Sequence, residues 1–159
     1  GISGHNFQAA WLLLRAAELT EVVSEKQEKL FKTTAAEILN SMLSKETVVD
    51  RVNGGVGDVY VRETGQTMWH TNKAWWQQAE AILALRAAEV AQIDVTNAKT
   101  VRKQIQSFYI NNFIDRTNGG EFAVVTKEGT AVDGEMKAQA GKSTYHAIEL
   151  ARFMIRYGE

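Results

Sequence analysis

The chain contains only three histidines, His5, His70 and His146, and these are its most direct candidates for proton transfer. An imidazole titrates near neutral pH, so it can both accept and donate a proton under working conditions. Each histidine lies at or just before the first turn of a segment that the sequence predicts to be helical. A single histidine at a helix start is more often a cap or a surface residue. Three at equivalent junctions favour one shared proton-transfer site.

A second group of candidates lies at the start of the segment from Asn72 to Gln92. Trp75 and Trp76 are followed by two polar residues, Gln78 and Glu80, in an otherwise apolar stretch. Aromatic faces beside buried polar groups suit a ligand that is polar at its edges and apolar on its faces, as sugars are. We expect one tryptophan to belong to the core and the other to face the pocket. Glu80 is expected either to interact with the helix dipole or to orient a pocket partner.

Gln8 lies one helical turn after His5 and faces the same way, which makes it a further pocket residue. Metal binding is the competing use of the histidines, but no His-x-x-x-His or nearby pair of carboxylates supports it, and we expect neither metal nor cofactor. The Asn-Gly-Gly elements at 53–55 and 118–120 predict turns. A phosphate cradle would need a following Lys-Ser/Thr or a strand-to-helix junction, which are absent.

Five predicted helices position these residues, and they are of two kinds. Three are apolar around most of their circumference and are predicted to be enclosed: Asn6–Glu25, Asn72–Gln92 and Ser143–Tyr157. Two carry a single apolar stripe and are predicted to cover the others: Glu25–Ser44 and Asn97–Phe113. Along the chain the two kinds alternate, beginning and ending with an enclosed helix.

The segments between the helices repeat as well. Asp-Arg-x-Asn-Gly-Gly occurs at 50–55 and at 115–120, an offset of 65 residues, and each copy leads into a β-like segment, at 58–62 and 121–126. A unit of one buried and one half-buried helix is stable only when it stacks on its neighbours. The pattern therefore predicts an all-α fold, part of an α/α toroid of inner and outer helices with small β-hairpins in the inner-side loops. An ordinary five-helix bundle is the alternative, but it explains neither the alternation nor the doubled turn.

Composition excludes several classes of protein. The 159 residues suffice for one domain, and 18 basic against 19 acidic residues form no basic block for nucleic acid. The absence of cysteine suits a reducing compartment, so we expect a cytoplasmic location. No run approaches the roughly 18 apolar residues of a membrane span, so no membrane partner is expected. The start, Gly-Ile-Ser-Gly-His, lacks an initiator Met and a signal peptide, and we expect the chain to derive from something longer.

Four motifs resemble, in order and spacing, the C-terminal half of the N-acylglucosamine 2-epimerase family, which includes cellobiose 2-epimerases and aldose–ketose isomerases of mannose-type sugars. They are Gly4-His5-x-x-Gln8-x-x-Trp11-Leu12-Leu13, Lys73-x-Trp75-Trp76-x-Gln78-Ala79-Glu80, Asn118-Gly119-Gly120 and Tyr145-His146. The resemblance covers nearly the whole chain. It implies an (α/α)6 barrel of six helix pairs, of which residues 1–159 are the C-terminal portion.

The resemblance also implies roles for individual residues. His5 and His146 match the two acid/base histidines, which move a proton at the carbon next to the opened sugar's carbonyl through an enediolate. Substrate-binding positions are expected at Gln8, His70, Trp75, Trp76 and Glu80. Two departures stand out: Gln8 replaces a common glutamate, and the family's Pro-Tyr-His-Asn reads Thr-Tyr-His-Ala at 144–147.

Two rival functions remain. A glycoside hydrolase on the same toroid needs two pocket carboxylates at a defined separation, and only Glu80 is a plausible one. A family member that binds a sugar or a protein without turnover is favoured by Gln8. Beyond the sugar, we expect the chain to associate with an N-terminal half of its parent or with further copies of itself. The two terminal enclosed helices lack neighbours, so the isolated chain is expected to be inactive.

Overall fold

The computed structural model describes residues 1–19, 21–45, 48–58, 60–63, 66–69, 72–138 and 141–158. Within them it has five helices: α1 (Ser3–Ala17), α2 (Glu25–Leu43), α3 (Trp75–Val90), α4 (Ala98–Asn112) and α5 (Tyr145–Tyr157). Its short strands are β1 (Tyr60–Glu63), β2 (Gln66–Trp69), β3 (Lys73–Ala74) and β4 (Val124–Val125). The predicted helical fold with small β elements in its loops is confirmed. No helix in these ranges is long and apolar enough to cross a membrane.

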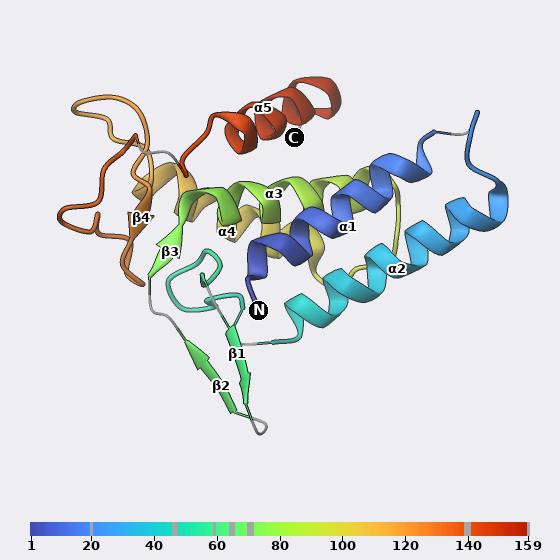
Figure 1. Ribbon diagram of the computed structural model, residues 1–159, viewed down its shortest axis with the longest axis horizontal. Coiled ribbons are helices and arrows are strands. Elements are labelled where there is room, and N and C mark those ends of the chain that lie inside the picture. The colour runs from blue at the N-terminus through green and yellow to red at the C-terminus, as the bar shows by residue number, and fades with distance from the viewer. Residues whose placement is uncertain are drawn as a thin grey trace.

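The centre of the structure is α3, which packs against α1, α4 and α5, while α2 packs mainly on α1. In Figure 1, α1, α3 and α5 begin towards the same end and run in the same general direction, and α2 and α4 return. Twelve of the 16 residues of α3 are buried, because neighbours surround it on most sides. An inner row of three helices with outer helices behind it is the arrangement predicted from the alternation.

The two terminal inner helices, α1 and α5, are less enclosed than α3. On α1, Leu12 is 47% exposed, and on α5 Ile155 is 85% exposed. Phe153 is the one buried residue of α5. Both helices pack on α3, and α1 also packs on α2, but each keeps an exposed apolar side. All-round burial is therefore reached in α3, whereas α1 and α5 keep exposed apolar sides, as expected for terminal enclosed helices that lack a neighbour.

The junction between the first two helices also differs from the prediction. The predicted first helix extends to Glu25, whereas α1 ends at Ala17. A capping box begins α2: Ser24 accepts from the backbone of Gln27, and the Gln27 side chain accepts from the backbone N–H of Ser24. This reciprocal pair fixes the start of α2. The chain needs a turn before it, so α1 must stop earlier.

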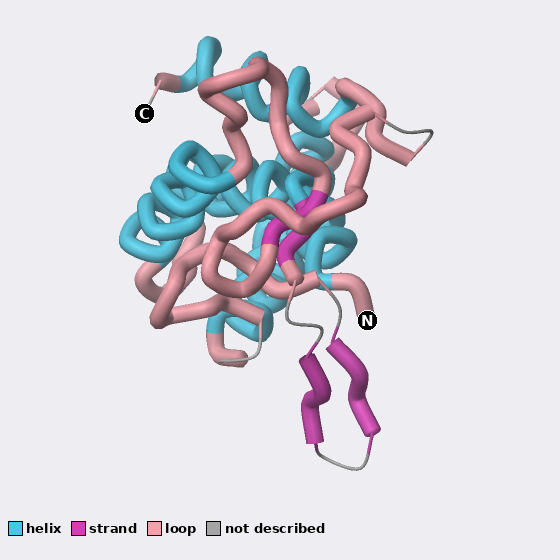
Figure 2. Tube along the Cα trace, turned by 90° about the vertical axis from the view of Figure 1, so that its left-hand side faces the viewer, coloured by secondary structure: helices cyan, strands magenta, loops and turns pink. Residues whose placement is uncertain are grey.

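Both predicted β-hairpins are present. β1 and β2 pair antiparallel and project from the body of the molecule (Figure 2); their turn lies outside the described residues. The predicted β-like segment 121–126 supplies β4, which forms the second hairpin with the residues after the turn at 128–129, through an antiparallel bridge between Val125 and Ala131. β4 also pairs with β3, where Lys73 lies opposite Val125. Such pairing across the chain ties the segment after α4 to the start of α3.

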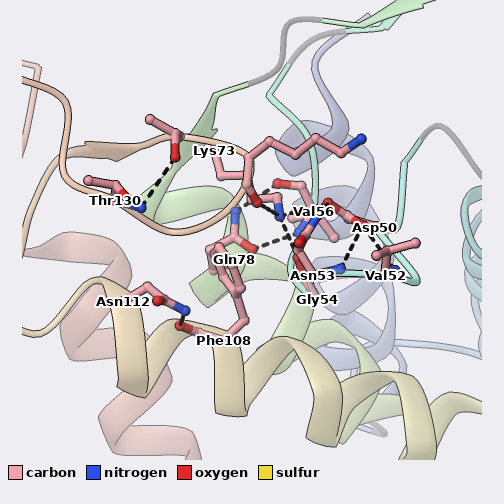
Figure 3. A network of polar contacts seen from close by, with 12 residues as sticks. Asp50, Val52, Asn53, Gly54, Val56, Lys73, Gln78, Phe108, Asn112 and Thr130 are labelled. Carbon is pink, nitrogen blue, oxygen red and sulfur yellow. Dashed lines mark hydrogen bonds and ion pairs between the residues drawn. The ribbon is translucent and has the colours of Figure 1, made fainter.

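The first Asp-Asn-Gly-Gly element, 50–55, is a turn held mainly by its own side chains. Asp50 Oδ1 accepts from the backbone N–H of Asn53 at 2.9 Å, and Gly54 and Gly55 have φ of 87° and 79°, which glycine adopts without steric cost. Lys73 Nζ closes the turn from β3, 3.0 Å from Asp50 Oδ2 and 2.6 Å from the Gly54 carbonyl (Figure 3). Burial raises the pKa of Asp50, but hydrogen bonds from Asn53 and Lys73 outweigh it and lower this pKa to about 2.

The second element, 115–120, repeats this construction in a more open setting. Asp115 accepts from the backbone and side chain of Asn118, and Lys137 donates to Asp115 and to the Gly119 carbonyl. The Lys73 side chain is 1% exposed, whereas that of Lys137 is 33% exposed. The first turn packs against Phe108 of α4, whereas no atom of the described residues lies within 4 Å of a Cβ added to Gly119. The two turns are therefore alike in their own bonds and unlike in their packing.

Candidate active site

The two terminal histidines meet at one tryptophan. His5 lies in the first turn of α1, Trp76 in the first turn of α3 and His146 in the first turn of α5. The ring centroids of His5 and Trp76 are 5.1 Å apart, and those of Trp76 and His146 are also 5.1 Å apart. Because the three inner helices begin at the same end of the molecule, His5 and His146 come together although they lie near opposite ends of the chain. Each contacts the indole ring of Trp76.

The two adjacent tryptophans have different environments. Trp75 is 6% exposed and contacts His146 edge to face, with ring centroids 6.3 Å apart. Its indole N–H is buried and has no hydrogen-bond acceptor among the described residues. Trp76 is half-buried and contacts both imidazoles. Trp75 thus belongs to the core, and Trp76 is the tryptophan that a ligand between the histidines would meet.

Glu80 connects His146 to α1. Its side chain is 1% exposed; Oε1 lies 2.6 Å from His146 Nδ1, and Oε2 accepts from the indole N–H of Trp11 at 2.5 Å. An ionised carboxylate can only accept hydrogen bonds, so it selects the form of His146 that carries a proton on Nδ1. In the neutral ring this leaves Nε2 unprotonated and available to accept a proton.

Tyr145 lies beside the same histidine. Its ring meets that of His146 edge to face at 5.1 Å. Burial and the charges of Glu80 and Glu149 raise the pKa of Tyr145, so its hydroxyl stays protonated near neutral pH and can donate a hydrogen bond. In the sequence, Tyr145 was identified only as the neighbour of His146 in a motif; the structure adds its ring contact with that histidine.

Two predicted site residues, Gln8 and His70, are not seen in contact with the two histidines and Trp76. Gln8 is half-buried, one turn along α1 from His5, and makes no hydrogen bond to His5 in the described part of the chain. His70 lies outside the described residues. The same ranges contain no group of three or more His, Cys, Asp or Glu side chains placed to hold a metal ion.

Two residues with a structural role at the site were missed as functional candidates. Trp11, part of a motif only, holds Glu80, and Gln77 holds the start of α1. A signal for Gln77 existed: it is polar in a helix that is otherwise apolar nearly all round. Its partner was not predictable, since the contact joins residues far apart in the chain.

Comparison with known proteins identifies the class. The family model described as N-acylglucosamine 2-epimerase (GlcNAc 2-epimerase) matches residues 3–150. The chain belongs to the N-acylglucosamine 2-epimerase family. No curated protein showed significant sequence similarity to it.

Solved structures show the same fold. A sugar epimerase from a ruminal bacterium superposes with a TM-score of 0.80 at 22% identity, over 99% of this chain and 38% of that one. A D-mannose isomerase gives 0.77 at 21% identity, over 98% and 37%. The cellobiose 2-epimerase of Bacillus thermoamylovorans gives 0.72 at 22% identity, over 98% and 37%. The chain thus has the fold of part of an (α/α)6 toroid and spans less than two-fifths of these relatives.

Proposed function

We propose that this chain is the part of a sugar 2-epimerase or aldose–ketose isomerase that supplies both acid/base histidines, His5 and His146. The observation that carries the proposal is the contact of both imidazoles with the single indole of Trp76. Family membership supports the reaction class. The similar structures named as a sugar epimerase, a mannose isomerase and a cellobiose 2-epimerase support a sugar as substrate.

The reaction needs two groups that exchange protons on one small region of an open-chain sugar. One neutral imidazole removes the proton from the carbon next to the carbonyl, and the electron pair moves onto the carbonyl oxygen to give an enediolate. The other imidazole, in its protonated form, then donates. Protonation of the same carbon on its opposite face gives the epimer. Protonation of the former carbonyl carbon, with transfer of the hydroxyl proton on the neighbouring carbon to the former carbonyl oxygen, gives the ketose.

Neighbouring side chains would prepare these two histidines. Glu80, itself held by Trp11, keeps a proton on Nδ1 of His146 and leaves Nε2 to exchange a proton with the substrate. A fixed tautomer lets this nitrogen act without prior rearrangement. Trp76 offers an indole face against which the apolar C–H face of a sugar packs. Glu80 acts through His146, so it is a positioning residue and not a catalytic one.

The test follows the substrate C2 proton in deuterated buffer by proton NMR, with mannose, N-acetylmannosamine and cellobiose. The chain is assayed alone and together with the N-terminal half of its parent, which we propose as its partner. His5→Asn and His146→Asn should each lower C2 exchange by at least about 10²-fold, the usual contribution of a general acid or base. Lys103→Asn, on the exposed face of α4, is the control. Exchange that survives both histidine changes would exclude them from the mechanism.

A sugar-binding protein without turnover is the second candidate, and Gln8 is the observation that favours it. The position next to His5 carries an amide instead of a carboxylate, so no negative charge assists His5 there. This candidate predicts saturable sugar binding with no C2 exchange in the assembled protein.

The hydrolase alternative has less support, because Glu80 is buried and both of its carboxylate oxygens are hydrogen-bonded. Release of glucose from cellobiose in the same assay would reveal it. A cytoplasmic location stays a prediction.

A further inference from the structure

We propose that Gln77 is a positioning residue for His5: a side chain of α3 that caps the start of α1 and thereby places the His5 imidazole against Trp76. The proposal rests on the acid/base role proposed for His5. It concerns what fixes the distance between the imidazole rings of His5 and His146, which no local sequence motif determines.

The start of α1 has no cap of its own. Its N-cap residue is Ile2, which makes no side-chain cap, and its first turn contains no acidic residue. The first backbone N–H groups of a helix have no partners within the helix and need acceptors from elsewhere. Gln77 Oε1 accepts from the Gly4 N–H at 2.8 Å and lies 2.6 Å from the Ser3 hydroxyl. A residue of another helix therefore performs the capping, directly before His5.

The other end of the same amide holds the loop before β1. Gln77 Nε2 donates to the Asp58 carboxylate, and the Ser3 hydroxyl also lies within hydrogen-bonding reach of the Gly57 carbonyl. Gln77 is 0% exposed. One buried side chain thus joins α3, the start of α1 and the loop that leads into the β1–β2 hairpin. Since a buried amide with satisfied ends is costly to move, this junction has little freedom.

The close approach at Gly4 makes the position of His5 depend on this junction. A Cβ on Gly4 would lie 2.5 Å from Cζ3 of Trp76 and 2.7 Å from Cγ of Gln77, so the backbone rests directly on these two side chains. His5 is the next residue. Within one stretch of α3, Gln77 holds the helix of His5, Trp76 contacts both imidazoles and Glu80 holds His146. That stretch sets the separation of the two rings.

The neighbouring Gln78 provides a matched control. It is also 0% exposed, and its amide bonds to the backbone N–H and carbonyl of Val56 and to the carbonyl of Ala74. These contacts hold the first Asp-Asn-Gly-Gly turn (Figure 3) and do not involve α1. Removing either glutamine disturbs several buried hydrogen bonds, but only one of the two contacts the helix of His5.

The experiment compares Gln77→Leu with Gln78→Leu in the 159-residue chain. Two signals are read: hydrogen exchange of the Gly4 amide, and the imidazole ¹⁵N and ¹H resonances, which the single His→Asn variants assign. Gln77→Leu should speed Gly4 exchange by about tenfold, the loss of one ordinary hydrogen bond, and shift the His5 resonances while leaving those of His146 in place. Gln78→Leu should change neither signal.

A second variant and a kinetic readout keep the proposal testable if Gln77→Leu fails to fold. Gln77→Asn keeps the amide but withdraws it by one methylene, and it should produce the same two changes more mildly. In the assembled enzyme it should lower kcat by about tenfold or more with little change in KM, because the loss concerns the geometry of a reacting group.

Three results would overturn the proposal: unchanged Gly4 and His5 signals in a folded Gln77→Asn, equal shifts of both histidines, or equal effects of the two leucine variants. These signals need no turnover, so they test Gln77 even if no C2 exchange is found. Absent exchange in the parent would instead contradict the proposed function.

Discussion

The duplicated Asp-Asn-Gly-Gly turn allows one interaction to be measured in two environments. Lys73→Met removes the ammonium group that donates to Asp50 and to the carbonyls of Gly54 and Lys127 and lies 4.0 Å from the ring centroid of Phe108. Lys137→Met removes the equivalent group from the second turn. We expect the first change to destabilise the chain strongly and the second to have little effect.

The expected magnitudes follow from burial. The Lys73 and Asp50 side chains are 1% and 5% exposed, so Lys73→Met leaves an unpaired buried carboxylate and two carbonyls without their donor. Breaking a buried ion pair in this way costs about 3–5 kcal/mol. Lys137 is 33% exposed, and water replaces its hydrogen bonds. Its partner Asp115 is 7% exposed, but because the ammonium group itself reaches water, we expect this pair to contribute about 1 kcal/mol or less. The two variants should therefore differ by about 3 kcal/mol in free energy of unfolding.

Urea unfolding followed by tryptophan fluorescence measures this difference. Protein concentration is held equal and varied in parallel, because association would shift apparent stability by mass action. The double variant Asp50→Asn, Lys73→Met should recover part of the loss, since removing the second charge removes the unpaired carboxylate. Equal destabilisation by Lys73→Met and Lys137→Met, within about 1 kcal/mol, would refute the argument that burial decides the strength of this pair.

Four further outcomes are expected. The pKa of Asp50 in the folded chain is about 2, against an ordinary 3.8, so its ionised form stabilises the fold above about pH 4. This stability is lost as the pH falls from about 4 to 2. In urea unfolding at pH 2–6, Asp50→Asn should remove about 2 kcal/mol of the pH dependence of the free energy of unfolding. Gly4→Ala should displace the Trp76 indole, lower stability by about 1 kcal/mol and shift tryptophan fluorescence, because overpacking outweighs the helix preference of alanine; a more stable variant would contradict the close approach. Gln8→Glu should raise C2 exchange in the assembled enzyme or move its pH dependence, and an unchanged pH–rate profile would show that this position has no electrostatic coupling to His5. The chain should sediment as a species larger than 17.7 kDa at micromolar concentration when no N-terminal half is present, because α1 and α5 expose apolar sides; a compact monomer would show that these sides need no cover.

Local features of the sequence were enough to predict the elements that depend on local interactions. The Ala- and Leu-rich stretch of α3 has high helix propensity and no polar face, so both its conformation and its burial were predictable. The two Asp-Asn-Gly-Gly turns were predictable because Asp50 and Asp115 accept hydrogen bonds from backbone N–H groups two and three residues ahead. The alternation of helix types also predicted the inner and outer layers, since a helix with one apolar stripe can bury only that stripe.

Burial and strand pairing depend instead on which residues from distant parts of the sequence lie beside a given residue in the fold. Lys73 and Lys137 follow the same turn motif, yet one is buried and the other half-exposed, because α4 covers only the first turn. The pairing of β3 with β4 joined segments that local patterns treated separately. The exposed sides of α1 and α5 show the same dependence, because apolar residues there have no neighbour among the described residues to cover them.

In the candidate site too, some features were predictable from the sequence and others were decided by tertiary packing. Residue type and spacing predicted His5, His146 and a pocket-facing tryptophan, because imidazole chemistry is a property of the side chain and helix starts can be read from the sequence. Which of Trp75 and Trp76 faces the histidines was decided by how α1 and α5 pack against α3. The contacts of Gln77 with α1 and of Glu80 with Trp11 were likewise decided only by packing. A buried polar side chain is stable only where partners satisfy it, and for these residues the partners come from helices that only the tertiary structure places within reach.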